Sequence, residues 1–251
     1  MFQDIYTIWL RELKLFFRKK SRVLSSLLFP FFWLFIFGAS FGSVVNTQFE
    51  GVDYMTFMLP GVIGLVILFQ SMFFGVSIIW DRRFGFLKEM LVAPITRNSI
   101  VMGKTLGGVT TVFFQVIIVW ILALIYGVPM NLGFFSVLLA ILVIFVTSST
   151  FVLIGIAIAS RLSDPQGFQF IMNLFIAPLF FLSGVFFPIT QLPSWISWAS
   201  YISPLTYGID ALRELMTGAS VFLLWQNLAV VASVFIAILV LTDQLFKHSP
   251  I

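Results

Sequence analysis

No charged side chain interrupts residues 105–160, which read TLGGVTTVFFQVIIVWILALIYGVPMNLGFFSVLLAILVIFVTSSTFVLIGIAIAS. A helix that crosses the hydrocarbon core of a bilayer needs about 20 apolar residues, so this stretch is long enough for two crossings. The turn-forming run Gly127-Val-Pro-Met-Asn-Leu-Gly133 lies near its middle and separates them. We therefore predict membrane-spanning helices at 105–126 and 136–159.

The composition of the whole chain agrees with a membrane location. Hydrophobic residues make up 60% and charged residues 10% of the 251 positions, and the mean hydropathy is +1.09. Soluble domains carry roughly 25% charged residues. Four further apolar runs are long enough to span, at 23–42, 56–80, 168–187 and 221–242. The predicted fold is an all-α membrane protein of six transmembrane helices, with residues 1–251 forming a single domain.

The distribution of Lys and Arg predicts the orientation, because cationic loops stay on the cytoplasmic side. All but Arg213 of the 14 Lys and Arg residues lie at the N-terminus, in the connection 81–104, or at Arg161 and Lys247. Six spans place these regions on one side, so both termini are expected in the cytoplasm. Since topology accounts for these cations, the net charge of +4 gives no reason to expect a nucleic-acid partner.

Residues 1–22 read as an amphipathic helix. One side is apolar (Ile5, Ile8, Trp9, Leu13, Phe16 and Phe17) and the other is cationic (Arg11, Lys14, Arg18 and Arg22). Such segments usually lie at the membrane surface on anionic lipid, and this is the interpretation we favour. A docking surface for a cytoplasmic partner is compatible with it.

The segment 188–216, on the opposite side, is too interrupted by proline to span. Two short helices that dip back into the outer leaflet are expected here, with Pro193 and Pro204 near their starts. Its aromatic residues suit the level of the lipid headgroups. Asp210 and Arg213 are three residues apart, a spacing that allows an ion pair on one helix face.

Side chains for catalysis are scarce. The chain has no cysteine, and its one histidine is His248 near the C-terminus, so neither a metal site nor a Ser/His nucleophile is predicted. Gly103-Lys104-Thr105 imitates the end of a phosphate-binding loop, but Asn98 stands where that motif requires glycine. We expect no enzymatic activity, no catalytic residue and no bound cofactor or metal in this chain.

Uncharged polar groups within the predicted spans are candidates for a transport pathway. Most are expected to form hydrogen bonds between helices. A minority, with neighbouring aromatic residues, would suit an apolar or amphiphilic solute better than an ion. The candidate residues are Gln70, Phe73, Gln115 and Asn173.

Pairs of small residues four positions apart predict close helix packing. They are Gly38/Gly42, Gly103/Gly107 and Gly155/Ala159. Because such residues let two backbones approach, each pair marks a contact either within the chain or with a second copy.

The cationic connection 81–104 carries a resemblance to a known family. Gly85-Phe-Leu-Lys-Glu-Met-Leu-Val-Ala-Pro94, followed by Gly103-Lys104 at the start of a span, resembles the loop between the second and third spans of ABC type-2 permeases. Ser183-Gly-Val-Phe-Phe-Pro188, Leu192-Pro193 and Ser203-Pro-Leu-Thr-Tyr207 are similar to the outer region of that family. The resemblance implies a half-transporter in the plasma membrane of a prokaryote. It would pair with a second copy of itself and with two cytoplasmic ATPase subunits, which would hold ATP and Mg²⁺.

The same resemblance implies which residues contact the ATPase. They are those of a short cytoplasmic coupling helix (Arg83, Phe84, Gly85, Phe86, Leu87, Lys88, Glu89, Leu91, Pro94 and Arg97) and those of the interfacial helix (Arg11, Lys14 and Arg18). Phe84, Phe86, Leu87 and Leu91 would form an apolar knob on the coupling helix. Many members read Gly-Thr-Leu-Glu where this chain has Gly85-Phe-Leu-Lys88; the Phe form resembles the branch of daunorubicin-type and nodulation-factor exporters, which favours drug-like or lipid-like cargo.

The leading hypothesis is thus the membrane subunit of an ATP-driven exporter of hydrophobic or amphiphilic solutes, such as a drug, a lipid or a lipid-linked glycan. An ion-coupled or passive transporter is an alternative, although the predicted span interiors carry no ionisable group. A lipid-modifying enzyme is a third, with Asp210, Arg213 and Glu214 as its only polar cluster.

Overall fold

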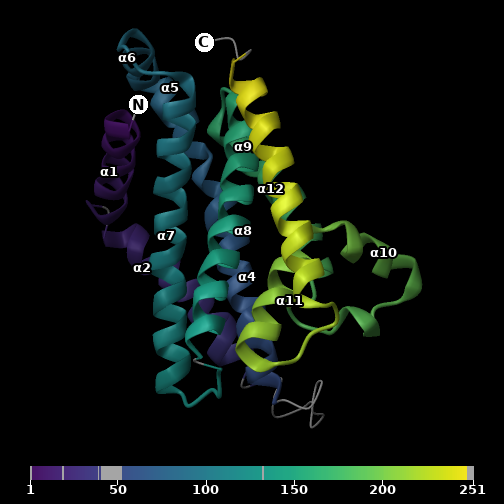
Figure 1. The fold of residues 1–251 in the computed structure, drawn as a ribbon. Helices are drawn as coiled ribbons and strands as arrows, with labels where there is room; N and C mark the ends of the chain where they lie inside the picture. Colours follow the sequence, from purple (N-terminus) through teal and green to yellow (C-terminus); the bar gives the residue numbers. More distant parts are fainter. Residues whose placement is uncertain (1, 19, 39, 41–52, 132, 248–251) are drawn as a thin grey trace.

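The computed structural model describes residues 2–18, 20–38, 40, 53–131 and 133–247. Within these ranges the fold is entirely helical, and its long helices lie side by side in an elongated bundle (Figure 1). The helix α6 (Phe86–Val92) and the end of α12 (Leu224–Lys247) lie at one end of the bundle, and the turn after α7 (Arg97–Ile125) lies at the other. We call these the α6 end and the far end.

Five helical segments among the described residues are long and apolar enough to cross a membrane. They are α4 and α5 together (Tyr54–Phe74 and Val76–Arg83), α7, α8 (Phe134–Arg161), α9 (Pro165–Leu182) and α12. They correspond to five of the six spans expected from the sequence, and they identify the chain as a membrane protein.

The sixth expected span, residues 23–42, is described only in part. α2 (Lys20–Phe31) continues into a π-helix, η1 (Phe32–Phe37), while residues 39 and 41–52 lie outside the described part of the chain. Pro30 lies in α2 just before the change of helix type. Since proline lacks the backbone N–H that an α-helix needs, it accounts for a disturbance of the regular pattern here.

The helix α4 forms the centre of the bundle. In residues 54–83, 72% of the most apolar stretch is buried by protein, against 22% in α9 and 11% in α12. A helix that is hydrophobic all round suits such a central position. α9 and α12 therefore present their apolar side chains outward, where a bilayer would cover them.

Glycines set the closest helix crossing. A Cβ on Gly75, between α4 and α5, would lie 2.3 Å from the carbonyl oxygen of Gly155 on α8, and one on Gly155 would lie 2.5 Å from that of Met72. Only residues without a side chain permit this approach of two backbones. Of the pair Gly155/Ala159, Gly155 therefore makes a helix contact within the chain.

The helix α7 begins at Arg97, eight residues before the expected span start at 105. The Thr96 hydroxyl caps its first turn by accepting a hydrogen bond from the Ser99 amide. At the other side of the connection, α5 continues to Arg83. The expected loop 81–104 is therefore largely helical, and Lys104 lies inside α7.

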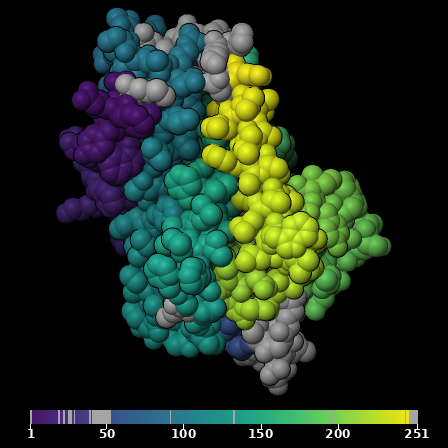
Figure 2. Space-filling model, viewed as in Figure 1, coloured from purple at the N-terminus to yellow at the C-terminus, as the bar shows by residue number. Residues whose placement is uncertain are grey.

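The segment 188–216 contains a 3₁₀ turn, η2 (Ile189–Gln191), and two helices, α10 (Ser194–Ile202) and α11 (Pro204–Thr217). The two short helices beginning after Pro193 and at Pro204 are confirmed. Figure 2 shows the segment that contains α10 protruding from the side of the bundle. Trp195 and Trp198 of α10 are exposed. α11 instead packs between α4, α8 and α12, and most of its residues are buried.

Replacing Gly155 with Val tests the backbone crossing. The new side chain would overlap the α4–α5 junction, and overpacking of this kind costs about 1–3 kcal/mol. We expect a lower thermal unfolding temperature of the detergent-solubilised protein. Ala177→Val is the control, because Ala177 lies exposed on α9. Equal stability of the two variants would contradict the crossing.

Candidate functional site

The N-terminal helix α1 (Phe2–Arg18) lies lengthwise against the first half of α7. A Cβ on Gly103 would lie 2.8 Å from Cβ of Ile8, and one on Gly107 would lie 2.7 Å from Cβ of Glu12. Further along, the Trp9 indole donates a hydrogen bond to the Thr110 hydroxyl at 2.9 Å. The pair Gly103/Gly107 is therefore a packing surface within the chain, and it receives α1.

This packing changes the interpretation of the amphipathic N-terminus. Ile8, Glu12 and Phe16 are buried by protein. The predicted apolar face is thus covered in part by α7, because two glycines open a groove for it there, and lipid does not contact the whole of that face. The exposed cations Lys14 and Arg18 remain on the outer side.

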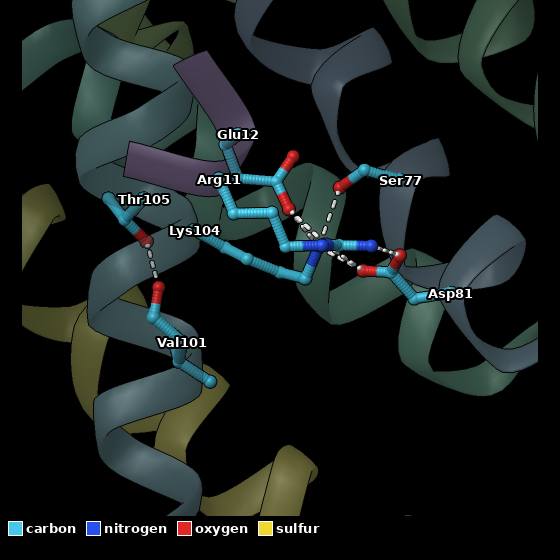
Figure 3. A network of polar contacts seen from close by, with 7 residues as sticks. All are labelled: Arg11, Glu12, Ser77, Asp81, Val101, Lys104 and Thr105. Atoms are coloured by element: carbon cyan, nitrogen blue, oxygen red, sulfur yellow. Dashed lines mark hydrogen bonds and ion pairs between the residues drawn. The ribbon is translucent and has the colours of Figure 1, made fainter. Parts of the chain in front are cut away.

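Four charged side chains from three helices meet beneath α1, as Figure 3 shows. Lys104 Nζ on α7 lies 2.8 Å from Glu12 Oε1 on α1 and 2.6 Å from Asp81 Oδ2 on α5. Arg11 on α1 contacts the same two carboxylates, at 2.9 Å from Glu12 and 2.6 Å from Asp81. We call Arg11, Glu12, Asp81 and Lys104 the charge cluster.

The charge cluster is electrically balanced, and three of its four members are buried, whereas the Arg11 side chain is 27% exposed. The exposed fraction is 0% for the Lys104 side chain, 5% for Glu12 and 9% for Asp81. Lys104 also donates a hydrogen bond to the Ser77 hydroxyl at 3.2 Å. Two cations face two carboxylates, so no net charge is taken out of water, and each ion has partners that offset its loss of hydration.

The charge cluster touches the helix α6 through Arg11. Its guanidinium carbon lies 3.7 Å from the centre of the Phe86 ring, a cation–π contact. Gly85, with φ +79°, makes the sharp turn that separates α6 from α5. Because this region of φ is costly for other residues, glycine is favoured at this position. α6 is thereby attached to α1, α5 and α7 at one point.

The surface of α6 differs from the expected apolar knob. Phe84 is 78% exposed, whereas Leu87 is 2% exposed and packs into the core, and Phe86 is half-buried under Arg11. The side chain of Leu91 lies outside the described part of the chain. Val92, which the sequence analysis did not select, is 88% exposed. Phe84, which stacks on the partly exposed Trp80, and Val92 are thus the most exposed apolar side chains of this turn and helix, because α6 turns its other apolar side toward the bundle.

The remaining expected contact residues surround this surface. Lys88, Glu89 and Pro94 are exposed, and Arg97 is half-buried at the start of α7. Arg83 is exposed, with its guanidinium carbon 5.9 Å from the Trp80 ring centre. The α6 end therefore presents exposed apolar side chains, Phe84, Val92 and Trp80, among charges of both signs, a composition suited to binding another protein.

The four candidate pathway residues lie on three helices, α4, α7 and α9, and differ in exposure. Gln70 donates a hydrogen bond to the Thr111 hydroxyl between α4 and α7, at 3.4 Å. Gln115 is buried in α7, and its Nε2 has no partner among the described residues. Phe73 is half-buried on α4. Asn173 alone of the four is exposed, on the outward face of α9.

Asp210 and Arg213 form a second buried polar group, beside α12. Asp210 accepts hydrogen bonds from the amides of Val221 and Phe222 and from the Asn227 side chain, all within 3.0 Å. Arg213 donates to the Gly184 carbonyl at 2.8 Å and lies over a phenylalanine ring of α4. These contacts join α11 to different neighbours, because the two side chains also reach toward different elements.

Glu12 and the role of Asp81 were not predicted from the sequence. A signal was present, since Glu12 lies between Ile8 and Phe16 at four-residue spacing, within the apolar face of α1. A carboxylate at such a position needs a buried partner. Its partner Lys104 is 92 residues away in the sequence, and nothing in the sequence alone connects the two.

The fold and this site define a class: a multispan helical membrane protein with a compact helical surface at one end, tied to its spans by buried charges. Residues 3–217 match the ABC-2 type transporter family. The chain belongs to this family, and the resemblance drawn from the loop sequence is confirmed.

Individual relatives agree with this assignment. The chain is 28% identical to nodulation protein J of Rhizobium leguminosarum bv. viciae, over 79% of this chain and 76% of that protein. It is 26% identical to the daunorubicin resistance ABC transporter permease protein DrrB1 of Streptomyces coeruleorubidus, over 80% of this chain and 69% of that protein. It is 28% identical to the inner membrane transport permease YadH of Escherichia coli (strain K12), over 82% and 80%.

Replacing Lys104 with Met tests the charge cluster. The change leaves two carboxylates facing one cation, and breaking a buried pair in this way costs about 3–5 kcal/mol. Thermal unfolding of the solubilised protein should show a large loss of stability, whereas Lys14→Met, an exposed cation on α1, should show little.

The double variant Lys104→Met with Glu12→Gln restores electrical balance. We expect it to recover part of the stability lost in Lys104→Met, because Arg11 then faces Asp81 alone. If the two substitutions instead add their separate losses, the four groups do not act as one cluster.

Proposed function

We propose that the chain is the permease subunit of an ATP-binding-cassette exporter. Two copies would form the membrane part, each with six spans and both termini in the cytoplasm, and two copies of a separate ATPase would bind at the α6 end. Membership of the ABC-2 type transporter family supports this assignment, and so does the relative DrrB1, whose name describes an ABC transporter permease.

One observation carries the proposal most directly: an exposed helix is firmly joined to several spans. The α6 end offers Phe84, in the turn before α6, and Val92, the last residue of α6, to a partner. Arg11 contacts Phe86 of α6 and, through the charge cluster, holds α5 and α7. A displacement of α6 would therefore move α1, α5 and α7 together, as rigid-body coupling of an external motor requires. ATP and Mg²⁺ would be held by that motor and not by this chain.

The proposed cargo is hydrophobic or amphiphilic. The exposed face of α9 combines Asn173 with Phe170, Leu174 and Phe175, which are 53–73% exposed. Of the four candidate pathway residues, Asn173 is the one available to line a passage formed with a second copy. Such a surface suits a drug, a lipid or a lipid-linked glycan, and one relative is named for daunorubicin resistance.

The geometry disfavours a lipid-modifying enzyme. Asp210 is held by two backbone amides and Asn227, and Arg213 lies buried against the Gly184 carbonyl. Glu214 accepts a hydrogen bond from Ser220. These contacts occupy the only polar cluster that the sequence offered for catalysis, so its role is structural.

A pull-down tests the partner. The solubilised chain is recovered from its native membrane as the wild type and as the double variant Phe84→Ser, Val92→Ser, and its soluble partners are identified by mass. Both side chains are exposed, so folding should be unaffected. We expect a P-loop ATPase with the wild type and at least a tenfold lower yield with the variant, because the apolar contact is lost.

The control is Phe134→Ser, which removes an equally exposed phenylalanine, 76% accessible, at the far end. It should retain the ATPase. Equal recovery of the ATPase with all three proteins would show that it does not bind through Phe84 and Val92. Substrate movement in vesicles without any ATPase would favour the passive or ion-coupled alternative.

Cysteine labelling tests the orientation. The chain has no native cysteine, so Val92→Cys and Phe135→Cys each provide a single thiol, at opposite ends of the bundle. In intact cells a membrane-impermeant maleimide should label the cysteine at 135 only, and permeabilised cells should show both. Labelling of the cysteine at 92 in intact cells would show that the α6 end faces outward, opposite to the proposed orientation.

A further inference from the structure

An apolar groove runs between α8, α9 and α12 toward the α6 end. Its volume is about 360 Å³, within the range of small-molecule sites. Ile158 lines it from α8 and Leu162 from just beyond the end of α8, Ile171 lines it from α9, and Leu241 and Leu245 line it from α12. It follows α8 from residue 154 to 161, which is roughly 10 Å at the rise of an α-helix.

The side chains that line the groove are almost all apolar. Thr242 is one of the few polar residues that line it, and its hydroxyl donates to the Leu153 carbonyl at 3.4 Å. That hydrogen bond occupies its donor within the bundle. A ligand would therefore gain contacts mainly from apolar surface, which favours a flexible hydrocarbon chain.

Among the described residues that line the groove, Arg161 is the one that carries a charge. It is the last residue of α8, it is exposed, and the described residues provide it with no hydrogen-bond or ion-pair partner. It is not needed to cap α8, because Arg82 already donates to the carbonyls of Ser160 and Leu162, at 2.9 and 3.2 Å. The nearby carboxylate of Asp164 accepts from the Gly167 amide at the start of α9. The guanidinium is thus free to bind an anion from outside.

We propose that this groove binds an anionic phospholipid, with one acyl chain between α8, α9 and α12 and the phosphate on Arg161. An apolar channel that ends in an unpaired cation matches a molecule with a hydrocarbon tail and an anionic head. A zwitterionic lipid fits the channel but carries a cation beside its phosphate. A second copy of the chain would have to bring a carboxylate to Arg161 or bury it unpaired, at a high desolvation cost.

This site is separate from the proposed transport pathway and does not depend on the identity of the cargo. A basic side chain at a membrane surface favours anionic lipid by about fivefold. Bound lipid would connect the ends of α8 and α12 with the start of α9.

Native mass spectrometry of the solubilised full chain tests the proposal. Phosphatidylglycerol and phosphatidylcholine with identical acyl chains are added in parallel, and inorganic phosphate is added in a third sample. The wild type should retain phosphatidylglycerol about fivefold more than phosphatidylcholine. It should not retain phosphate, which lacks the chain that fills the groove.

Two variants test the contact with the lipid headgroup and the contact with the acyl chain separately. Arg161→Gln should abolish the preference for phosphatidylglycerol while leaving the fold intact, because Arg161 is exposed; Lys20→Gln, another exposed cation, is its control. Ala157→Phe should fill the groove and reduce retention of both lipids, with Leu138→Phe on an exposed face of α8 as its control.

Three results would overturn the proposal. The first is equal retention of the two lipids by the wild type, and the second is an unchanged preference in Arg161→Gln. The third is loss of a dimer signal in Ala157→Phe with lipid retention unchanged, which would assign the groove to a second copy of the chain. If Ala157→Phe fails to fold, the lipid preference of Arg161→Gln still tests the proposal.

Discussion

Lys104 is a fully buried ammonium group inside a helix that must cross a membrane, and the arrangement of the α6 end depends on how its charge is balanced. An unpaired charge in that position would cost several kcal/mol. Glu12 and Asp81 supply the two carboxylates, and Arg11 balances the second one. Because these groups come from α1, α5 and α7, satisfying one buried charge fixes three helices relative to one another. The interaction specifies an arrangement more than it adds stability, since apolar residues of the same shape would pack without any cost of dehydration.

Steric fit and charge act together at this site. Gly103 and Gly107 let α1 approach α7 closely enough for Glu12 to reach Lys104. Similar fits recur elsewhere in the bundle, where Gly75 meets Gly155. In a bilayer, lipid is as apolar as the helices, so association relies on such close packing and on polar contacts. The second buried polar group, around Asp210 and Arg213, has the same role for α11, which it joins to the start of α12 and to the loop at Gly184.

The group around Asp210 and Arg213 and the charge cluster have different roles in the molecule. Asp210 and Arg213 hold α11 within the bundle through hydrogen bonds to backbone groups of Val221, Phe222 and Gly184. The charge cluster lies next to an exposed helix, and Arg11 belongs both to the cluster and to the contact with Phe86. In the proposed exporter, a motor acting on Phe84 and Val92 would therefore act on a rigid unit. A flexible loop at this place would absorb the displacement instead of transmitting it.

The sequence by itself determined the membrane location, five of the spans, the short helices after Pro193 and at Pro204, and the family. Each of these follows from local properties: the length of an uncharged run, a proline, or a motif of ten residues such as Gly85 to Pro94. Only the tertiary structure decided which side chains meet. It buried Leu87 and left Val92 exposed, it gave Asp210 and Arg213 separate partners, and it brought Glu12 to Lys104. The physical reason is that an apolar helix in a membrane protein presents similar side chains on every face. Its sequence therefore does not show which face contacts lipid and which contacts protein, and charge pairing between distant helices becomes visible only when they are packed.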